Sequence, residues 1–378
     1  MLESYRQCCF DLEATGKVRK LPERLTPISP ELDFTHNDYL GLCRHPDILA
    51  AGLKAAREYG VGASGSRLLS GNPPLFSLFE AAIAQDKHTD SALIFNSGFQ
   101  ANLSVLASLL DARVLGARPV VFFDKANHAS MYQAVFLSGA ELVRYKHLDY
   151  AHLESSLQRF KADSRPKFIV TETVFGMDGD VVSIPNIEAI AAKHKAFIYL
   201  DEAHAVGMVG PSGFGLSTQL SHEIPSVSMG TFSKAVGVSG GYVASSALIK
   251  DYLLNKAQGF IYSTANSPFV IGAAFKAWQL MREMHAERER LMDLAQSLRL
   301  RLKALGLNTG NSTTHIIPII HPSLPFLQAL QVRFREAGIG VSFIRPPTVP
   351  PNASRLRIAI NTAHSASSVN ALIQVLCA

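Results

Sequence analysis

Short apolar, β-branched runs that alternate with helical patterns constrain the fold of this chain most strongly. Each run ends in polar or small residues, and the runs are Leu93–Phe95, Val120–Phe123, Phe168–Val170 and Phe197–Leu200. This alternation predicts βαβ units around a buried, mostly parallel sheet, because parallel strands need crossover helices. The polar residues then lie at the carboxyl ends of strands, where open α/β sheets bind ligands. We therefore expect an α/β fold whose chemistry gathers at one edge of the sheet.

The C-terminal part of the chain predicts a smaller second layer. No turn cluster interrupts residues 267–305, and leucines recur there at helical spacing among charged residues that we interpret as a solvated helix face. Beyond this expected long helix, Ile316–Ile320 and Arg355–Ile360 have the pattern of strands. The predicted division is an N-terminal segment over residues 1–43, a large domain over 44–275, and a linking helix with a small domain over 276–378.

Charge and cysteine content argue against several classes of protein. The 36 Lys and Arg residues against 31 Asp and Glu residues give a net charge of +5, spread too evenly to require a nucleic-acid partner. The four cysteines include no CxxC pair, so we expect a reducing, cytoplasmic compartment and neither a metal site nor a disulfide framework. Without a signal peptide or an apolar run of membrane-spanning length, no membrane partner is expected.

One lysine, Lys234, lies among small and hydroxyl residues in the sequence GTFSKAVGVSGG, which starts at Gly230. Small neighbours let a bulky cofactor approach the backbone, and hydroxyls and amides can hold a phosphate. A desolvated lysine has the lowered pKa that Schiff-base chemistry requires. An ordinary glycine-rich loop is the alternative interpretation of this segment taken alone.

Asp201 opens the sequence DEAH directly after the apolar run that ends at Leu200. An aspartate at the end of a strand can pair with a protonated pyridine nitrogen, so that the ring accepts electrons from a carbanion. A helix N-cap or a structural ion pair is the alternative. DEAH also resembles a helicase Walker B box, but that box needs a partner P-loop, and the chain contains no GxxxxGK[ST] motif.

Two further segments suit a flat, phosphorylated cofactor. NSGFQAN over residues 96–102 is expected to open a helix whose free amides and dipole favour a phosphate. His128, in NHAS over residues 127–130, could stack on a ring at the same edge of the sheet, although a lone histidine is more often structural. Each pattern is weak alone.

Taken in order, these motifs resemble those of the α-oxoamine synthases, fold-type I enzymes that depend on pyridoxal 5'-phosphate (PLP). The resemblance extends over nearly the whole chain, and its motifs are NHAS at 127, TETVFGMDGD at 171, DEAH at 201 and GTFSKAVGVSGGY at 230. It implies the fold-type I PLP-dependent transferase fold, with a large, mostly parallel sheet of the seven-stranded type and a small C-terminal α/β domain. It also implies a homodimer with shared active sites.

The resemblance assigns cofactor roles to residues of these motifs. Lys234 would hold PLP as a Schiff base, and Asp201 would pair with the pyridine nitrogen. His204 would contact the phenolic oxygen, and His128 would stack on the ring. The other residues expected around the cofactor are Ser97, Gly98, Phe99, Glu172, Gly176, Thr231 and Ser233, with Thr264 reaching the phosphate from the neighbouring subunit.

Within the family, IRPPTVP at 344 followed by RLRI at 355 is most like the members that condense L-alanine with a pimeloyl thioester, on CoA or acyl-carrier protein, in biotin synthesis. Sister enzymes that use glycine or serine are the alternative, and the presence of the catalytic residues argues against a non-catalytic paralogue. Residues that resemble substrate contacts are Arg19, Asn37, His128 and Thr348. Arg345 and Arg357 are candidates for the amino-acid carboxylate, which a guanidinium binds bidentately.

The chain departs from the family pattern at several positions. Gly176 replaces a common serine, Phe76 stands where histidine is common, and Phe214 replaces an arginine between two glycines. The stretch before Asn37 is also shorter than usual. We expect these changes to leave PLP chemistry intact and to affect recognition of the thioester, whose acyl length and carrier stay open.

Overall fold

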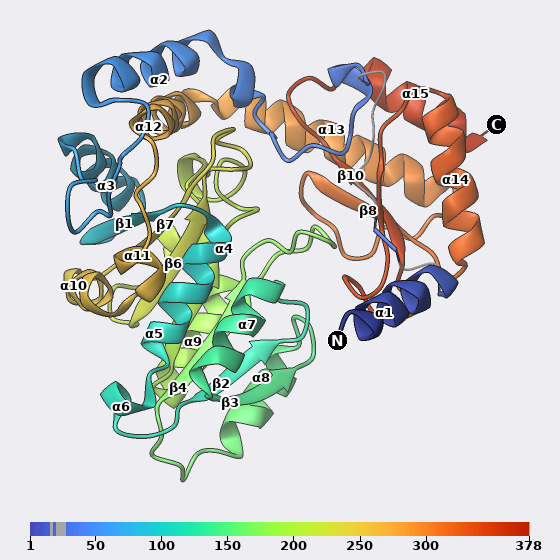
Figure 1. Cartoon of the computed structure of the whole chain (residues 1–378). Coiled ribbons are helices and arrows are strands. Elements are labelled where there is room, and N and C mark those ends of the chain that lie inside the picture. The colour runs from blue at the N-terminus through green and yellow to red at the C-terminus, as the bar shows by residue number, and fades with distance from the viewer. Residues whose placement is uncertain (16–17, 20–27, 378) are drawn as a thin grey trace.

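Two β-sheets organise the part of the chain that this computed structural model describes, residues 1–15, 18–19 and 28–377 (Figure 1). The larger sheet has the strand order β1-β7-β6-β5-β4-β2-β3, and the smaller has the order β8-β10-β9. In the larger sheet β7 is antiparallel to both neighbours, whereas the other strand pairs are parallel. The strands of the larger sheet are β1 (Ser91–Phe95), β2 (Val120–Asp124), β3 (Glu141–Tyr145), β4 (Lys167–Glu172), β5 (Phe197–Asp201), β6 (Ser226–Thr231) and β7 (Gly241–Ser245).

Helices cover both faces of the larger sheet, which explains why its strands are continuous apolar runs in the sequence. In β2, Phe123 belongs to a core cluster with Met131 of α7 (Ala129–Ser138), whereas Phe122 belongs to another with Leu153 of α8 (Tyr150–Gln158). Between residues 46 and 261 the other α- and π-helices are α2 (Pro46–Tyr59), α3 (Pro74–Asp86), α4 (Gly98–Ala101), the π-helical η3 (Asn102–Leu106), α5 (Ala107–Leu109), α6 (Ala112–Leu115), α9 (Ile184–His194), α10 (Ala247–Lys256) and α11 (Gln258–Ile261), and the 3-10 helices are η4 (Pro211–Gly213) and η5 (Leu216–Gln219).

The smaller sheet contains the two strands expected in the C-terminal part of the chain. They are β8 (Ile316–Ile320) and β10 (Arg355–Ala359), and β9 (Ser342–Ile344) pairs with the other edge of β10. Helix α14 (Leu324–Glu336) packs against this sheet, and α15 (Ala366–Cys377) packs against α14. The larger sheet thus lies within residues 44–275 and the smaller within 276–378, while the domain boundaries themselves stay a prediction.

The expectation of one long helix over residues 267–305 is wrong. The structure has two helices there, α12 (Pro268–Glu283) and α13 (His285–Ala304), with Met284 between them in a non-helical conformation (ψ 48°). The buried guanidinium of Arg288 donates a hydrogen bond to the Met281 carbonyl at 2.7 Å, so a side chain bonds the carbonyl next to the break. Helix α12 packs against α2, and α13 continues to the smaller sheet (Figure 1).

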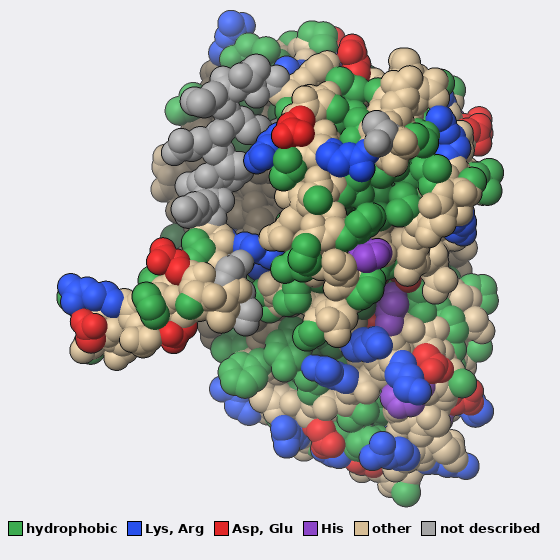
Figure 2. All heavy atoms as spheres, turned by 90° about the vertical axis from the view of Figure 1, so that its right-hand side faces the viewer, with side chains coloured by type: hydrophobic (Ala, Val, Ile, Leu, Met, Phe, Trp, Pro, Cys, Tyr) green, Lys and Arg blue, Asp and Glu red, His purple; other side chains and the backbone are tan. Residues whose placement is uncertain are grey.

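The N-terminal helix α1 (Leu2–Ala14) has no buried residue, and in the view of Figure 1 it lies below α14. On the face of the molecule that carries this sheet, basic, acidic and apolar side chains are interspersed (Figure 2). Among the described helices, none combines the length and apolar character needed to cross a lipid bilayer.

Candidate active site

The candidate site lies at the carboxyl edge of the larger sheet, where parallel strands β4, β5 and β6 end. Glu172 ends β4 and is paired in register with Asp201, which ends β5. Thr231 ends β6, and Lys234 follows it by three residues. Because these strands are parallel, their polar end residues meet at one edge of the sheet.

Lys234 has an environment that favours its neutral amine. Burial lowers the pKa of Lys234 to about 8, although the nearby carboxylates of Asp201 and Glu172 favour the charged form. The Arg357 guanidinium adds a further lowering effect on this pKa. A lysine with a pKa near 8 has a substantial neutral fraction close to neutral pH, which is the form that attacks an aldehyde.

Glu172 and His204 are shifted toward neutral forms by the same surroundings. Burial and the charge of Asp201 raise the pKa of Glu172 well above its ordinary value, against the opposing effect of Lys234. Burial lowers the pKa of His204 well below its ordinary value, and the positive charges of Lys234 and Arg357 lower it further. The other carboxyl group of the site, Asp201, accepts hydrogen bonds from two neighbouring groups.

Both carboxylate oxygens of Asp201 accept hydrogen bonds. Oδ1 accepts from the Ala203 amide at 2.8 Å, and Oδ2 accepts from the Asn102 side-chain amide at 2.7 Å. Asn102 also donates to Ser130 Oγ at 2.9 Å and accepts from the Tyr199 hydroxyl at 2.8 Å. Our sequence reasoning missed Asn102, Ser130 and Tyr199, although Asn102 ends the segment NSGFQAN that it singled out.

His128 is the N-cap residue of α7, and its side chain is exposed at the site. Its Nδ1 lies 2.7 Å from Ser130 Oγ and accepts from the Ser130 amide at 3.3 Å. The Phe99 ring meets the imidazole edge-on, with ring centroids 6.3 Å apart. The imidazole is thus oriented through Nδ1 while its exposed surface stays available to a flat ligand.

The expected phosphate-binding residues lie together beside the end of β1. Ser97 Oγ accepts from the Gln100 amide at 3.1 Å and so caps α4, which begins at Gly98. A Cβ added to Gly98 would lie 3.2 Å from Thr231 Cβ, so glycine lets the two segments approach closely. The Thr231 and Ser233 hydroxyls are 2.8 Å apart. Amides at this helix start and the two hydroxyls form a suitable cradle for a phosphate.

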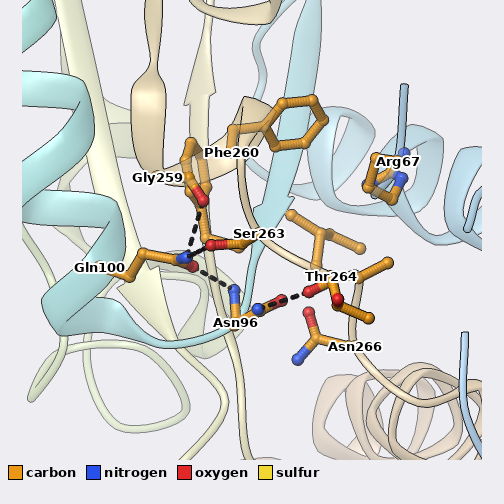
Figure 3. Close-up of a pocket in the computed structure, with 11 residues that line it drawn as sticks. Arg67, Asn96, Gln100, Gly259, Phe260, Ser263, Thr264 and Asn266 are labelled. Carbon is orange, nitrogen blue, oxygen red and sulfur yellow. Dashed lines mark hydrogen bonds between the residues drawn. The ribbon is translucent and has the colours of Figure 1, made fainter. Parts of the chain in front are cut away.

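Thr264 lies near this cradle in its own chain, on a small polar pocket (Figure 3). The Asn96 side chain donates to the Thr264 carbonyl at 2.8 Å, and Gln100 donates to Ser263 Oγ at 2.8 Å and to the Gly259 carbonyl at 2.7 Å. These bonds fix the segment that carries Thr264 to the phosphate loop. The expected reach of Thr264 into a neighbouring subunit stays a prediction.

Arg357 brings the smaller sheet to the site from β10. Its Nε donates to the Gly176 carbonyl at 2.6 Å, and Nη2 donates to Asn37 Oδ1 at 3.0 Å and to the Tyr39 hydroxyl at 3.2 Å. The Tyr39 hydroxyl is also 2.8 Å from His204 Nδ1. Two expected substrate residues, Arg357 and Asn37, thus meet the expected cofactor residues Gly176 and His204. Tyr39, which joins them, was not assigned a role from the sequence.

Gly176 lies directly against His204. A Cβ added at residue 176 would lie 2.2 Å from His204 Nε2, well inside van der Waals contact. The serine that the family resemblance leads us to expect at this position is therefore incompatible with the imidazole as it lies here. The His204 imidazole thus occupies the space that a side chain at residue 176 would need.

The other expected substrate residues form a separate group. Arg19 donates to Thr348 Oγ1 at 3.2 Å, and Arg345 donates to the Val18 carbonyl at 2.7 Å. These contacts join the N-terminal segment to the segment after β9. Arg345 and Arg357 were equal candidates for a carboxylate in the sequence, and the described contacts place only Arg357 beside Gly176, Asn37 and Tyr39.

Two departures from the family pattern lie in the core. Phe76 is buried, and the Arg67 guanidinium stacks on its ring at 4.0 Å. Phe214 is also buried, and its ring packs against Trp278 with centroids 5.1 Å apart. Both phenylalanines therefore fill core positions.

A phosphorylated pyridine aldehyde fits the groups around Lys234. The partly neutral amine suits an aldehyde, and the buried carboxylate of Asp201 suits a protonated ring nitrogen. The exposed imidazole of His128 suits the face of a ring. The close approach of Gly98 and Thr231 leaves backbone and hydroxyl groups for the phosphate.

Comparison with known proteins agrees with this fit. Residues 29–376 match the family model for aminotransferase class I and II. The chain is 40% identical over 347 residues to 8-amino-7-oxononanoate synthase of Gluconacetobacter diazotrophicus, covering 91% of this chain and 87% of that protein.

Two solved structures have the same fold over most of their length. A serine palmitoyltransferase variant from S. paucimobilis with a bound PLP-myriocin aldimine has a TM-score of 0.88 at 27% identity, covering 99% of this chain and 95% of its own. The 8-amino-7-oxononanoate synthase from Francisella tularensis has a TM-score of 0.80 at 25% identity, covering 92% and 97%. The expected fold class, cofactor and enzyme class are thus confirmed. The chain belongs to the aminotransferase class I and II family and, within it, to the PLP-dependent α-oxoamine synthases.

Proposed function

We propose that the enzyme condenses L-alanine with a pimeloyl thioester to give 8-amino-7-oxononanoate, CO2 and the free thiol of the carrier, either CoA or acyl-carrier protein. The observation that carries this proposal is the meeting of Arg357 and Asn37 with Lys234, Asp201 and His204 at one edge of the sheet. Support for the choice of substrates comes from the relatives that are named 8-amino-7-oxononanoate synthase.

The proposed roles of the residues follow from their charges. PLP, when bound, supplies the electron sink that lets an amino acid lose its Cα proton. Asp201 keeps the ring nitrogen protonated through its fixed negative charge, which acts strongly in a buried site. The amine of Lys234, with its pKa of about 8, accepts the Cα proton and later returns it. His128 covers one face of the ring and excludes water from it.

Arg357 is proposed to bind the amino-acid carboxylate. Its guanidinium is held by the Gly176 carbonyl, Asn37 and Tyr39, so its orientation is set before substrate arrives. A preoriented guanidinium binds a carboxylate with little further loss of side-chain entropy. Neutral His204 contacts the phenolic oxygen of the cofactor and is oriented by Tyr39.

The active sites are proposed to be completed by homodimer formation. Several large apolar side chains are highly exposed, including Phe136 at 83%, Tyr262 at 82% and Leu69 at 84% exposure. Exposed apolar side chains of this size favour burial in a protein interface. Thr264, two residues after Tyr262, would then reach the phosphate of the partner site.

A reducing, cytoplasmic compartment is also proposed. All four cysteines, Cys8, Cys9, Cys43 and Cys377, are exposed and unpaired, as expected where thiols stay reduced.

The visible absorption of the PLP-loaded enzyme tests the amino-acid substrate. We expect L-alanine to shift the cofactor band, and subsequent pimeloyl-CoA to release CO2, CoA and a product with the mass of 8-amino-7-oxononanoate. A variant carrying Lys234→Ala should not turn over. Turnover confined to L-serine with a long-chain acyl-CoA would instead favour a serine palmitoyltransferase activity, which the structural similarity to that enzyme makes the second candidate.

A further inference from the structure

Asn102 is a buried amide at an irregular point of the helix that follows the phosphate loop. Its side chain lies in the core with 1% exposure, and it is the first residue of the π-helical η3 between α4 and α5. Single π-helical turns within α-helices are rare and are often found at functional sites. The hydrogen bonds of Asn102 therefore bear on how the site is built.

The orientation of the Asn102 amide follows from its partners. A carboxylate only accepts hydrogen bonds, so the NH2 group must face Asp201 Oδ2, 2.7 Å away. The amide oxygen then accepts from the Tyr199 hydroxyl at 2.8 Å. Burial raises the pKa of Tyr199 well above its ordinary value, so this hydroxyl keeps its proton. Tyr199 thus fixes the amide, and the amide fixes one oxygen of Asp201.

The same amide reaches the group proposed to cover the ring. Its NH2 donates its second hydrogen bond to Ser130 Oγ at 2.9 Å, which leaves the Ser130 hydroxyl proton for His128 Nδ1 at 2.7 Å. Because Nδ1 also accepts from the Ser130 backbone amide, the neutral imidazole carries its proton on Nε2. One side chain therefore connects Asp201, at the ring nitrogen, with His128, at the ring face.

We propose that Asn102 is a positioning residue, held by Tyr199, that sets the Asp201 carboxylate and, through Ser130, the His128 imidazole for PLP. The proposal rests on the cofactor roles given above for Asp201 and His128. With Oδ1 held by the Ala203 amide and Oδ2 by Asn102, the carboxylate cannot rotate, and each oxygen keeps a lone pair for the ring nitrogen. Loss of the amide frees one oxygen, so the carboxylate can rotate away from the position that it holds for the ring nitrogen.

Asn102→Leu removes the hydrogen bonds at nearly constant side-chain volume. Loss of a hydrogen bond to a charged group is expected to weaken PLP binding about 10- to 100-fold. We also expect the pH midpoint of the cofactor's visible absorption to shift relative to wild type. Tyr199→Phe should shift both readouts in the same direction by a smaller factor. The matched control is Ser108→Ala, which removes a hydroxyl from α5 that bonds the Ser104 and Lys256 carbonyls rather than the site.

A double-mutant cycle separates positioning from a general structural role. In an Asp201→Asn background, Asn102→Leu should produce a clearly smaller shift of the absorption midpoint, because one of the two groups through which it acts, Asp201, is already neutral. A further shift as large as in the wild-type background would overturn the proposal. So would a folded Asn102→Leu protein with the PLP dissociation constant and pH profile of wild type.

These readouts need no acyl substrate. An enzyme that binds PLP but does not use pimeloyl-CoA would refute the proposed function and leave the role of Asn102 to be decided by the same titrations. If Asn102→Leu does not fold, as judged by circular dichroism, Asn102→Ser and Tyr199→Phe decide the question. An unchanged PLP dissociation constant and unchanged midpoint in both would refute the proposal.

Discussion

The buried ion pair between Lys87 and Glu202 gives the sharpest prediction about stability. Both side chains are 0% exposed, and the Lys87 ammonium contacts both the Glu202 carboxylate and the Phe214 carbonyl. Glu202 is the second residue of DEAH and also accepts from the Ser217 amide at 2.9 Å and its hydroxyl at 2.6 Å. Lys87 therefore joins the end of α3 to the segment that follows Asp201.

Lys87→Met leaves the carboxylate of Glu202 buried without its counter-ion. Removing one partner of a buried ion pair costs about 3–5 kcal/mol of unfolding free energy, and we expect the lower end because Ser217 still donates two hydrogen bonds. Adding Glu202→Gln removes the uncompensated charge, so the double variant should be more stable than Lys87→Met alone. The second change therefore restores part of the unfolding free energy that the first change removes, so the two effects are not additive.

The chain provides a matched control in the exposed pair Lys193 and Glu154. These side chains are 62% and 40% exposed, so Lys193→Met should cost at most about 1 kcal/mol. Urea unfolding measures all four proteins at one protein and one PLP concentration, because ligand binding and association change apparent stability. Equal losses for Lys87→Met and Lys193→Met, or a double variant less stable than Lys87→Met, would refute the reasoning.

Three further predictions concern the site and its supports. Gly176→Ala should displace the His204 imidazole, which an added Cβ would approach to 2.2 Å, and lower kcat about 10- to 100-fold in steady-state assays. Arg357→Lys should raise the KM for L-alanine more than that for the acyl thioester, since a lysine cannot bind a carboxylate bidentately. Burial disfavours charged His147, but its hydrogen bonds to Asp124 and Asp180 outweigh this and raise its pKa to about 10. The stability that charged His147 contributes is therefore complete below about pH 6.5 and lost as the pH rises toward 10, so the urea-unfolding difference from His147→Gln should shrink across that range.

The positions of several site residues were predictable because topology alone determines them. Asp201 and Glu172 follow apolar runs, and parallel strands bring their carboxyl ends to one edge whatever the side-chain details. Lys234 was recognisable because a single charged residue stood among small and hydroxyl residues. These inferences needed only the direction of strands and the composition of one segment.

Other parts of the site depend on contacts between distant segments. Asn102 lies in an apolar stretch of helix, where nothing in the sequence pairs it with Asp201, 99 positions later. Tyr39 reads as a core residue, and only the fold brings its hydroxyl to His204 and Arg357. The break at Met284 likewise has no glycine or proline beside it in the sequence. The Arg288 side chain bonds the Met281 carbonyl, seven residues earlier, and only the fold shows this contact.

The segment that follows β4 connects the cofactor side of the site with the substrate side. The Gly179 carbonyl accepts from the Thr314 amide and hydroxyl, at 3.2 and 2.9 Å, just before β8 begins. A Cβ at Gly179 would lie 1.9 Å from the Ile316 carbonyl, and its φ of +70° also favours glycine. The same segment provides the Gly176 carbonyl that holds Arg357. The position of the smaller sheet and the orientation of the proposed carboxylate-binding group are therefore set by one stretch of backbone, which also places Gly176 against His204.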